Sequence, residues 1–271
     1  MMRSLWTAAS GMRSQQTNVD VISNNLANVN TVGYKKESAE FKSLLYQTIQ
    51  SRTTSANGAE KPIGAQVGLG VRNASISSNF DQGTLNPTEN NFDFAIQGQG
   101  FFQMMGEDGE TYYTRNGSFG MAMSTNGIVL ANADGLPVLD VDGQPIILDA
   151  DTDTSKITVM EDGNLALPDE TNNPAPIGVQ LGLVQFANPA GLEKTGGSLF
   201  ATTAASGDPM LEIENNGLKL SSIKQGYLES SNVQVVDEMV DLIVAQRAYE
   251  MNSKAIQASD EMLSQANSLR R

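Results

Sequence analysis

The stretch SLWTAASGMRSQQTNVDVISNNLANVN, residues 4–30, decides how the N-terminal end of the chain folds. Its apolar and small residues recur in alternating steps of three and four, which is the heptad spacing of a helix that packs along one stripe. A similar spacing returns near the C-terminus, and neither end contains proline, which would interrupt a long helix. We therefore predict helices over residues 4–30 and 233–268, with Gly33 as a stop signal after the first.

Two amphipathic helices at opposite ends of a chain can pair as a coiled coil, or each can pack separately on the central domain. The similar spacing of the two stripes favours the coiled coil. The residues of the predicted stripes are also predicted to take part in self-assembly. They are Leu5, Met12, Val19, Ile22, Leu26 and Val29 in the first helix, and Val235, Met239, Leu242, Tyr249, Ile256 and Leu263 in the second.

The end of the first predicted helix is unusually rich in asparagine, a poor residue for a helix interior because its amide competes for backbone groups. Asn24, Asn25 and Asn28 lie at positions i, i+1 and i+4, and therefore on one side of the helix. They form either a solvated polar strip or a packed interface in which amides hydrogen-bond between chains. A buried asparagine fixes the register of a helical interface, so we predict a self-assembly interface here.

The middle of the chain carries five Asp-Gly or Asn-Gly turn signals, which are typical of tight hairpins. They are EDGE (107–110), TNGI (125–128), ADGL (133–136), VDGQ (141–144) and EDGN (161–164). Short β-type runs such as DFAIQG, GFFQMM, TYYTR and GIVLA flank them. The pattern predicts an α+β protein whose centre is an all-β domain of short antiparallel strands.

Three regions follow from these patterns. Residues 1–35 and 225–271 form a terminal helical domain, residues 36–71 an extended connector, and residues 72–224 the β domain.

Residues 71–224 contain 20 acidic and 6 basic residues, whereas the two ends together contain 11 of each. A neutral segment can pack against copies of itself, and an acidic one suits exposure to water. The net charge of −14 argues against binding to nucleic acid or to an anionic membrane.

The amino-acid composition argues against a catalytic function. The chain has no cysteine and no histidine, which excludes disulfides, thiolate nucleophiles, most zinc sites and the commonest general base. The segment DADTDTSK (149–156) resembles part of a calcium loop but lacks its glycine and its final glutamate, so a solvated acidic loop is favoured. GQGFF (98–102) resembles a phosphate loop but lacks the lysine, so a strand entry is favoured. We predict no catalytic residue, no metal ligand and no cofactor.

The chain also lacks a run of about 18 apolar residues that could cross a membrane. Its first residues lack the apolar core of a signal peptide. We therefore expect a cytosolic protein or one exported without a cleaved signal.

Long motifs resemble the bacterial flagellar rod and hook axial proteins. They are residues 4–36, ending in VNTVGYKK; GYLESSNVQVVDEMVDLIVAQRAYEMNSKAIQASDEML (226–263); and DFAIQGQGFFQM (93–104) followed by YTRNGSF (113–119). They stand in the order of that family and span nearly the whole chain. The connector LLYQTIQSRTTSANGAEKPIGAQVGLGVR (44–72) resembles an insertion found in distal rod members.

The resemblance implies a structural subunit that polymerises helically with copies of itself around a central channel, as a rigid drive shaft. The paired helices would form the inner tube and the β domain the outer layer. Implied partners are the proximal rod proteins, the hook protein, the surrounding basal-body rings, the flagellar export apparatus and the rod cap. The implied location is the basal body in the periplasmic space, reached by type III export without a cleaved signal peptide.

The connector is predicted to stiffen the rod through apolar anchors at Tyr46, Ile63, Val67 and Leu69. Two alternatives stay open. One is a proximal rod or hook subunit of the same family. The other, from a different class, is a soluble β-domain enzyme or metal-binding module with oligomerising helices.

Overall fold

A computed structural model describes residues 2–50, 65–124, 127–149, 154–168, 174–213 and 217–269. The chain divides into two compact units. The helical unit comprises Met1–Ala27, Glu37–Ser78 and Gln234–Arg271, and the β unit comprises Asn28–Lys36 and Asn79–Val233. By sequence the helical unit holds ten acidic and ten basic residues, and the β unit 21 acidic and seven basic. The charge asymmetry therefore follows the division into units.

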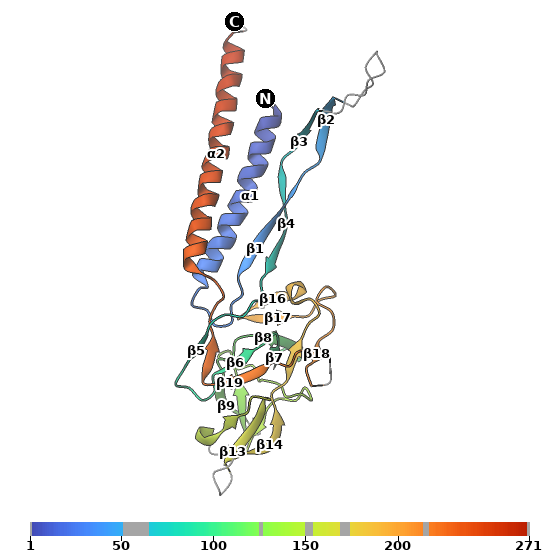
Figure 1. The fold of residues 1–271 in the computed structure, drawn as a ribbon, viewed down its shortest axis with the longest axis vertical. Helices are drawn as coiled ribbons and strands as arrows, with labels where there is room; N and C mark the ends of the chain where they lie inside the picture. The colour runs from blue at the N-terminus through green and yellow to red at the C-terminus, as the bar shows by residue number, and fades with distance from the viewer. Residues whose placement is uncertain are drawn as a thin grey trace. The chain divides into compact units, whose positions relative to one another are not determined.

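The helical unit is built on two helices that lie side by side (Figure 1), α1 (Met2–Ala27) and α2 (Val235–Ser268). Both helices were predicted from the sequence, and the α+β class is confirmed. The first helix ends three residues earlier than predicted. Asn28 accepts hydrogen bonds from the backbone N–H and the hydroxyl of Thr31, at 3.2 and 3.1 Å, and so begins a turn. The local competition of asparagine with helical hydrogen bonds explains the early end.

The predicted connector forms paired strands in the helical unit. Strand β1 (Glu37–Ser43) pairs with β4 (Val71–Ser78), and β2 (Tyr46–Gln50) pairs with β3 (Ala65–Gly68), both antiparallel. Strands β1 and β4 also contact α1. Asn73 Nδ2 donates to Thr17 Oγ1 at 2.7 Å, and the Val71 N–H donates to Ser10 Oγ at 3.3 Å. Pairing satisfies backbone groups that an isolated extended segment would leave to water.

Within its described residues, the β unit contains one six-stranded sheet, two three-stranded sheets and two strand pairs, all antiparallel. The six-stranded sheet has the order β16 (Glu193–Gly196), β17 (Leu199–Ala201), β8 (Thr111–Thr114), β7 (Phe101–Met105), β15 (Leu183–Gln185), β18 (Met210–Leu211). The three-stranded sheets are β11 (Ile147–Leu148), β10 (Gly127–Ala131), β9 (Gly120–Ser124), and β12 (Thr158–Val159), β13 (Asn164–Pro168), β14 (Pro174–Gln180). The pairs are β19 (Ser222–Gln225) with β6 (Phe94–Gln97), and β20 (Tyr227–Glu229) with β5 (Leu85–Pro87).

The turn signals of the sequence lie where hairpins need them. The glycine of each of the five motifs has a positive φ, between 73° and 138°. These are Gly109, Gly127, Gly135, Gly143 and Gly163. A side chain at such a position would be strained, so glycine fits there without cost. Gly98 in the GQGFF segment lies between β6 and β7, so that segment is a strand entry, as favoured from the sequence.

The core of the β unit has two apolar clusters. The larger gathers aliphatic and aromatic side chains from the three-stranded sheets and from β6, β7 and β19, including Phe94, Phe102 and Phe119. The smaller is aromatic and centres on Phe101, with Phe186 and Phe200 packed edge-on against it at 5.6 and 6.0 Å between ring centroids. Burial of these side chains makes the β unit a self-contained globular part.

Candidate assembly surfaces

Contacts between α1 and α2 follow a regular antiparallel register. The Ser4 and Ser259 hydroxyls lie 3.4 Å apart, and Asn25 Nδ2 donates to Glu238 Oε2 at 3.1 Å. Between these contacts, Gly11 lies against Asn252: a Cβ atom at Gly11 would come 2.9 Å from Asn252 Nδ2. The missing side chain therefore lets α2 approach α1 closely at that point.

The face of α2 that turns toward α1 differs from the predicted stripe. The fully buried residues of α2 are Glu238, Ala245 and Ser259, at multiples of seven residues from one another. A charged residue and two small ones therefore form the most buried part of this face, and the sequence analysis did not select them. Of the predicted residues, Leu242, Ile256 and Leu263 are half-buried, while Val235, Met239 and Tyr249 are exposed.

On α1 the predicted stripe is closer to the observed one. Ile22 and Asn25 are buried, and Asn24 is exposed. The remaining predicted residues are half-buried: Leu5, Met12, Val19, Leu26, Asn28 and Val29.

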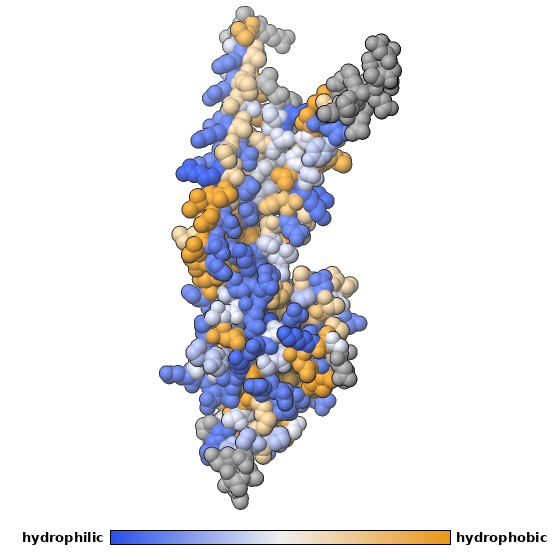
Figure 2. Space-filling view, in the orientation of Figure 1, coloured by the Kyte–Doolittle hydropathy of each residue, from blue (hydrophilic) through white to orange (hydrophobic). Residues whose placement is uncertain are grey.

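A second apolar surface lies on the outer side of α2. Val236, Val240, Ile243 and Val244 are all more than half exposed, and Val236 is 74% exposed. Residues two apart on an α-helix point about 200° apart, so Val236 and Val240 face away from the buried Glu238. We call Val236, Val240, Ile243 and Val244 the outer stripe. Figure 2 shows a hydrophobic band over this part of α2. An exposed apolar band of this kind is typical of a protein interface.

Asn25 is the most deeply buried polar group of α1, with 1% of its surface exposed. Besides Glu238, its Nδ2 donates to the Glu37 carbonyl oxygen at 2.8 Å, and its Oδ1 accepts from the Glu37 N–H at 2.9 Å. One amide therefore joins α1, α2 and the start of β1. Asn24 is exposed and donates to the Glu37 carboxylate at 3.3 Å.

We expect Asn25→Leu to weaken the helical unit by about 1–3 kcal/mol, because the Glu37 backbone and the buried Glu238 carboxylate would each lose a partner. The matched control is Asn24→Leu, whose side chain is exposed and which should change stability by about 0.5 kcal/mol or less. The measurement is urea unfolding followed through the helical circular dichroism signal. Equal effects of the two changes would contradict the role given to Asn25.

The sequence hypothesis places Asn24, Asn25 and Asn28 at an interface between chains, and that role stays a prediction. For Asn25 the structure supplies partners within the same chain, so its loss should affect the subunit as well as any assembly. Normal motility and normal rod length in the triple Leu variant would contradict the interface hypothesis.

Three charged side chains are buried together in the β unit. Lys35 Nζ lies 2.7 Å from Glu229 Oε1, and Arg115 Nε lies 3.8 Å from Glu229 Oε2, with each side chain 1% exposed. Lys35 also donates to the Asp81 carbonyl oxygen at 2.8 Å, and Arg115 to the Gly98 carbonyl oxygen at 2.7 Å. Burial and then the charge of Arg115 lower the pKa of Lys35, and burial lowers the pKa of Arg115. Glu229 is therefore the counter-charge that two desolvated cations share.

This charge cluster joins distant parts of the chain. Lys35 stands in the segment that follows α1, and Glu229 in the segment that precedes α2. The Gly33 N–H donates to the Glu229 carbonyl oxygen at 2.8 Å, and the Lys36 N–H to Asn232 Oδ1 at 2.7 Å. The motifs YKK, YTRNGSF and GYLESS carry the three charges, but their local spacing holds no signal that the residues meet. Sequence reasoning missed the cluster for that reason.

The predicted connector anchors lie partly in the described strands. Tyr46 in β2, Val67 in β3 and the neighbouring Leu69 are exposed. Ile63 lies outside the described residues. Exposed apolar side chains on a two-stranded ladder are available to a neighbouring molecule.

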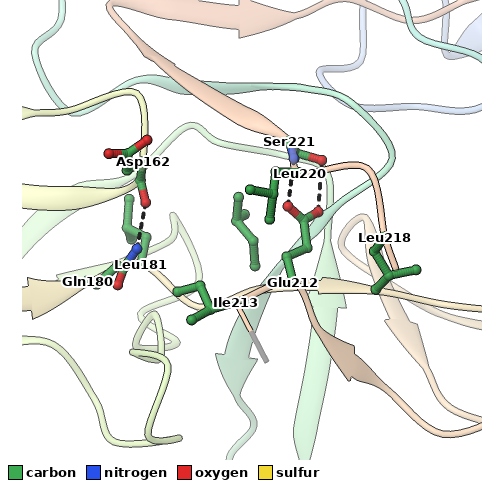
Figure 3. Close-up of a pocket in the computed structure, with 9 residues that line it drawn as sticks. Asp162, Gln180, Leu181, Glu212, Ile213, Leu218, Leu220 and Ser221 are labelled. Atoms are coloured by element: carbon green, nitrogen blue, oxygen red, sulfur yellow. Dashed lines mark hydrogen bonds between the residues drawn. The ribbon is translucent and has the colours of Figure 1, made fainter. Parts of the chain in front are cut away.

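A cavity of about 340 Å³ lies in the β unit. Figure 3 shows Leu181, Ile213, Leu218 and Leu220 around it, with Glu212 hydrogen-bonded to Ser221. The Glu212 carboxylate accepts from the Ser221 N–H at 2.7 Å and hydroxyl at 2.8 Å, and from Gln185 Nε2 at 2.9 Å. These hydrogen bonds give the Glu212 carboxylate a structural role.

Within the described ranges, no three acidic side chains gather in a group that could hold a metal ion. Residues 150–153 of the acidic segment 149–156 lie outside those ranges. Neither α1 nor α2, as far as the structure describes them, is apolar enough over a sufficient length to cross a membrane.

Comparison with protein families gives three matches. The family described as flagella basal body rod protein matches residues 5–35. The flagellar hook protein FlgE/F/G D1 domain matches residues 95–167, and the flagellar basal body rod FlgEFG protein C-terminal family matches residues 224–269. The matches cover α1, part of the β unit, and α2 with the segment before it.

Curated relatives are similar over the full length. The flagellar basal-body rod protein FlgG of Borreliella burgdorferi is 44% identical over 273 residues, covering all of both chains. FlgG of Agrobacterium fabrum is 45% identical over 97% of both chains, and FlgG of Bacillus subtilis is 36% identical over all of both. An enzymatic function has no support in these relatives. The chain belongs to the flagellar basal-body rod protein family and is a structural, non-enzymatic component of the flagellar basal body.

Proposed function

We propose that the chain is the subunit of the distal rod and polymerises helically into a rigid, hollow shaft that transmits motor torque to the hook. The observation that carries this proposal is the outer stripe of α2. A helix that buries one face against α1 and still exposes Val236, Val240 and Ile243 has an apolar surface left for another molecule.

The distribution of charge supports the same arrangement. The helical unit is neutral by sequence and the β unit carries the whole net charge of −14. Neutral helical units can pack densely around an axis without mutual repulsion, and acidic β units remain soluble on the outside. In this proposal α1 and α2 form a coiled coil. The step of seven residues from Ser4 to Gly11, matched by the step from Ser259 to Asn252, is the expected heptad spacing.

Partners and location follow from the same proposal. The subunit would join proximal rod proteins on one side and the hook protein on the other, inside the surrounding basal-body rings. It would reach the periplasmic space through the flagellar export apparatus, without a cleaved signal peptide, and add beneath a rod cap. The relatives carry the name of basal-body rod proteins, which supports a place in the rod.

Deleting part of the connector tests the proposed mechanical role. A polymer bends when its subunits slide past one another, and an extra segment held between neighbours opposes sliding. Even a contact energy of about 1 kcal/mol per subunit opposes bending, because many such contacts must break at the same time. We expect deletion of residues 50–65 to leave a polymer that is curved and compliant. The measurement is electron microscopy of polymer shape and persistence length.

A variant that replaces residues 51–64 with a Gly/Ser sequence of equal length is the matched control, since it keeps the chain length and removes the side chains. Straight polymers of unchanged stiffness from both variants would contradict the mechanical role of the connector. Failure of the unaltered chain to enter any polymer would contradict the proposed function itself.

A further inference from the structure

A groove opens on the helical unit between α1 and β4. Its volume is about 500 Å³, and its lining residues are Trp6, Ala9, Ser10, Arg13, Ser14, Val71, Arg72 and Asn73. Three of the lining residues, Ala9, Ser10 and Ser14, are small, which allows another backbone to approach closely. Trp6 is 74% exposed. A large exposed aromatic side chain beside small residues is the composition of a binding hot spot.

The groove is also basic. Arg13 comes from α1 and Arg72 from β4, and both guanidinium groups are exposed. Lys42 lies opposite Arg72 in the β1–β4 ladder and adds a third positive charge nearby. None of the lining residues is acidic. An occupant should therefore combine apolar side chains with negative charge.

The outer stripe of α2 has that combination. Asp237 and Asp241 are exposed, lie at i and i+4, and flank Val236, Val240 and Val244. From Val236 to Val244 the stripe is about 12 Å long at 1.5 Å per residue, and the α1 wall from Trp6 to Ser14 has the same length. The two surfaces have the same length, each combines apolar and charged groups, and their charges are opposite in sign.

Both surfaces belong to the same unit, but one chain cannot bring them together while its helices stay paired. Glu238 and Ala245 of α2 face α1, and the outer stripe points to the opposite side. We propose that the groove of one copy receives the outer stripe of a second copy. This inference rests on the proposed function and names the surfaces that make its subunit contact. This contact joins two different surfaces, and such a contact propagates into an open helical polymer when the rotation between copies does not close a ring.

Disulfide crosslinking in assembled rods tests the contact, because the chain has no cysteine of its own. We expect the variant Ala9→Cys/Val240→Cys to give a ladder of crosslinked oligomers under mild oxidation. Each single variant can give at most a dimer. The matched control is Ala9→Cys/Lys254→Cys, because Lys254 lies on the same side of α2 as Val240 but about 21 Å further along. It should give no ladder, since a disulfide needs Cβ atoms about 4 Å apart.

Charge reversal gives a second readout. Arg13→Glu/Arg72→Glu should lower the amount of assembled rod about tenfold or more, because like charges would then face each other across the contact. Adding Asp237→Arg/Asp241→Arg should restore assembly to within about threefold of the unaltered chain. Normal rods without a ladder, and unaffected by the arginine reversal, would overturn this contact and leave the proposed function standing. Absence of rods from the unaltered chain would instead overturn the proposed function.

Discussion

The Glu229→Gln substitution is expected to lower the free energy of unfolding of the β unit by about 3–5 kcal/mol, which is the usual cost of removing one partner from a buried ion pair. Lys35 and Arg115 would then remain buried without the carboxylate that they share, leaving the attraction of Asp81 on Lys35 and of Glu212 on Arg115. The loss is a large share of the 5–15 kcal/mol that typically stabilises a domain. Urea unfolding of the full chain, followed by circular dichroism of the β signal, measures it.

The exposed ion pair of Arg247 and Glu250, 2.9 Å apart on α2, provides the control. Glu250→Gln should change the stability by about 1 kcal/mol or less, because solvent screens an exposed pair. The double variant Lys35→Met/Glu229→Gln should lose less than the sum of its single changes, since either one already breaks the pair. Similar losses of unfolding free energy from Glu229→Gln and Glu250→Gln would show that the buried cluster contributes no more to stability than an exposed ion pair.

The Gly117→Ala substitution should cost about 4 kcal/mol or more and prevent the β unit from folding normally. A Cβ atom at Gly117 would overlap the Phe94 carbonyl oxygen and come 3.2 Å from the Phe102 ring. The Phe94 N–H donates to the Gly117 carbonyl oxygen at 2.9 Å, so these two segments cannot separate without losing that bond. Phe94 and Phe102 belong to the main apolar cluster, where overpacking is costly.

Gly120→Ala is the matched control for that change. Nothing lies within 4 Å of a Cβ atom at Gly120, which stands in the exposed part of β9. We expect its stability to stay within about 0.5 kcal/mol of the unaltered protein. Soluble yield and thermal unfolding distinguish the two variants, and a normally folded Gly117→Ala protein would contradict the close packing described here.

Features that depend on local chemistry were predicted from the sequence. The proline-free heptad stripes predicted both helices. The Asp-Gly and Asn-Gly pairs predicted the turns at Gly109, Gly135 and Gly143. The strand runs around DFAIQG and GFFQMM became β6 and β7.

Individual side-chain contacts between distant segments were not predicted. Glu238 reads as an exposed charge in a helical pattern, and its burial follows only from the position of Asn25, 213 residues away. The same holds for Lys35 and Glu229, which lie 194 residues apart. The face of α2 that packs on α1 was not singled out for a related reason: the helix has apolar residues on two sides, and periodicity alone does not show which side meets α1. The self-assembly role of the predicted stripe stays a prediction.

The pairing of α1 with α2 also sets an order in time. A ribosome adds about 5–20 residues per second, and the partner of the first helix is the last element to be made. Ser4 meets Ser259, 255 positions later, so α1 waits about 10–50 s before its partner exists. The short hairpins of the β unit, such as β7–β8 and β9–β10, can form during that interval because their contacts are near in sequence. The newborn chain therefore exposes an unpaired helix until it is complete, and a truncated chain never acquires the helical unit at all.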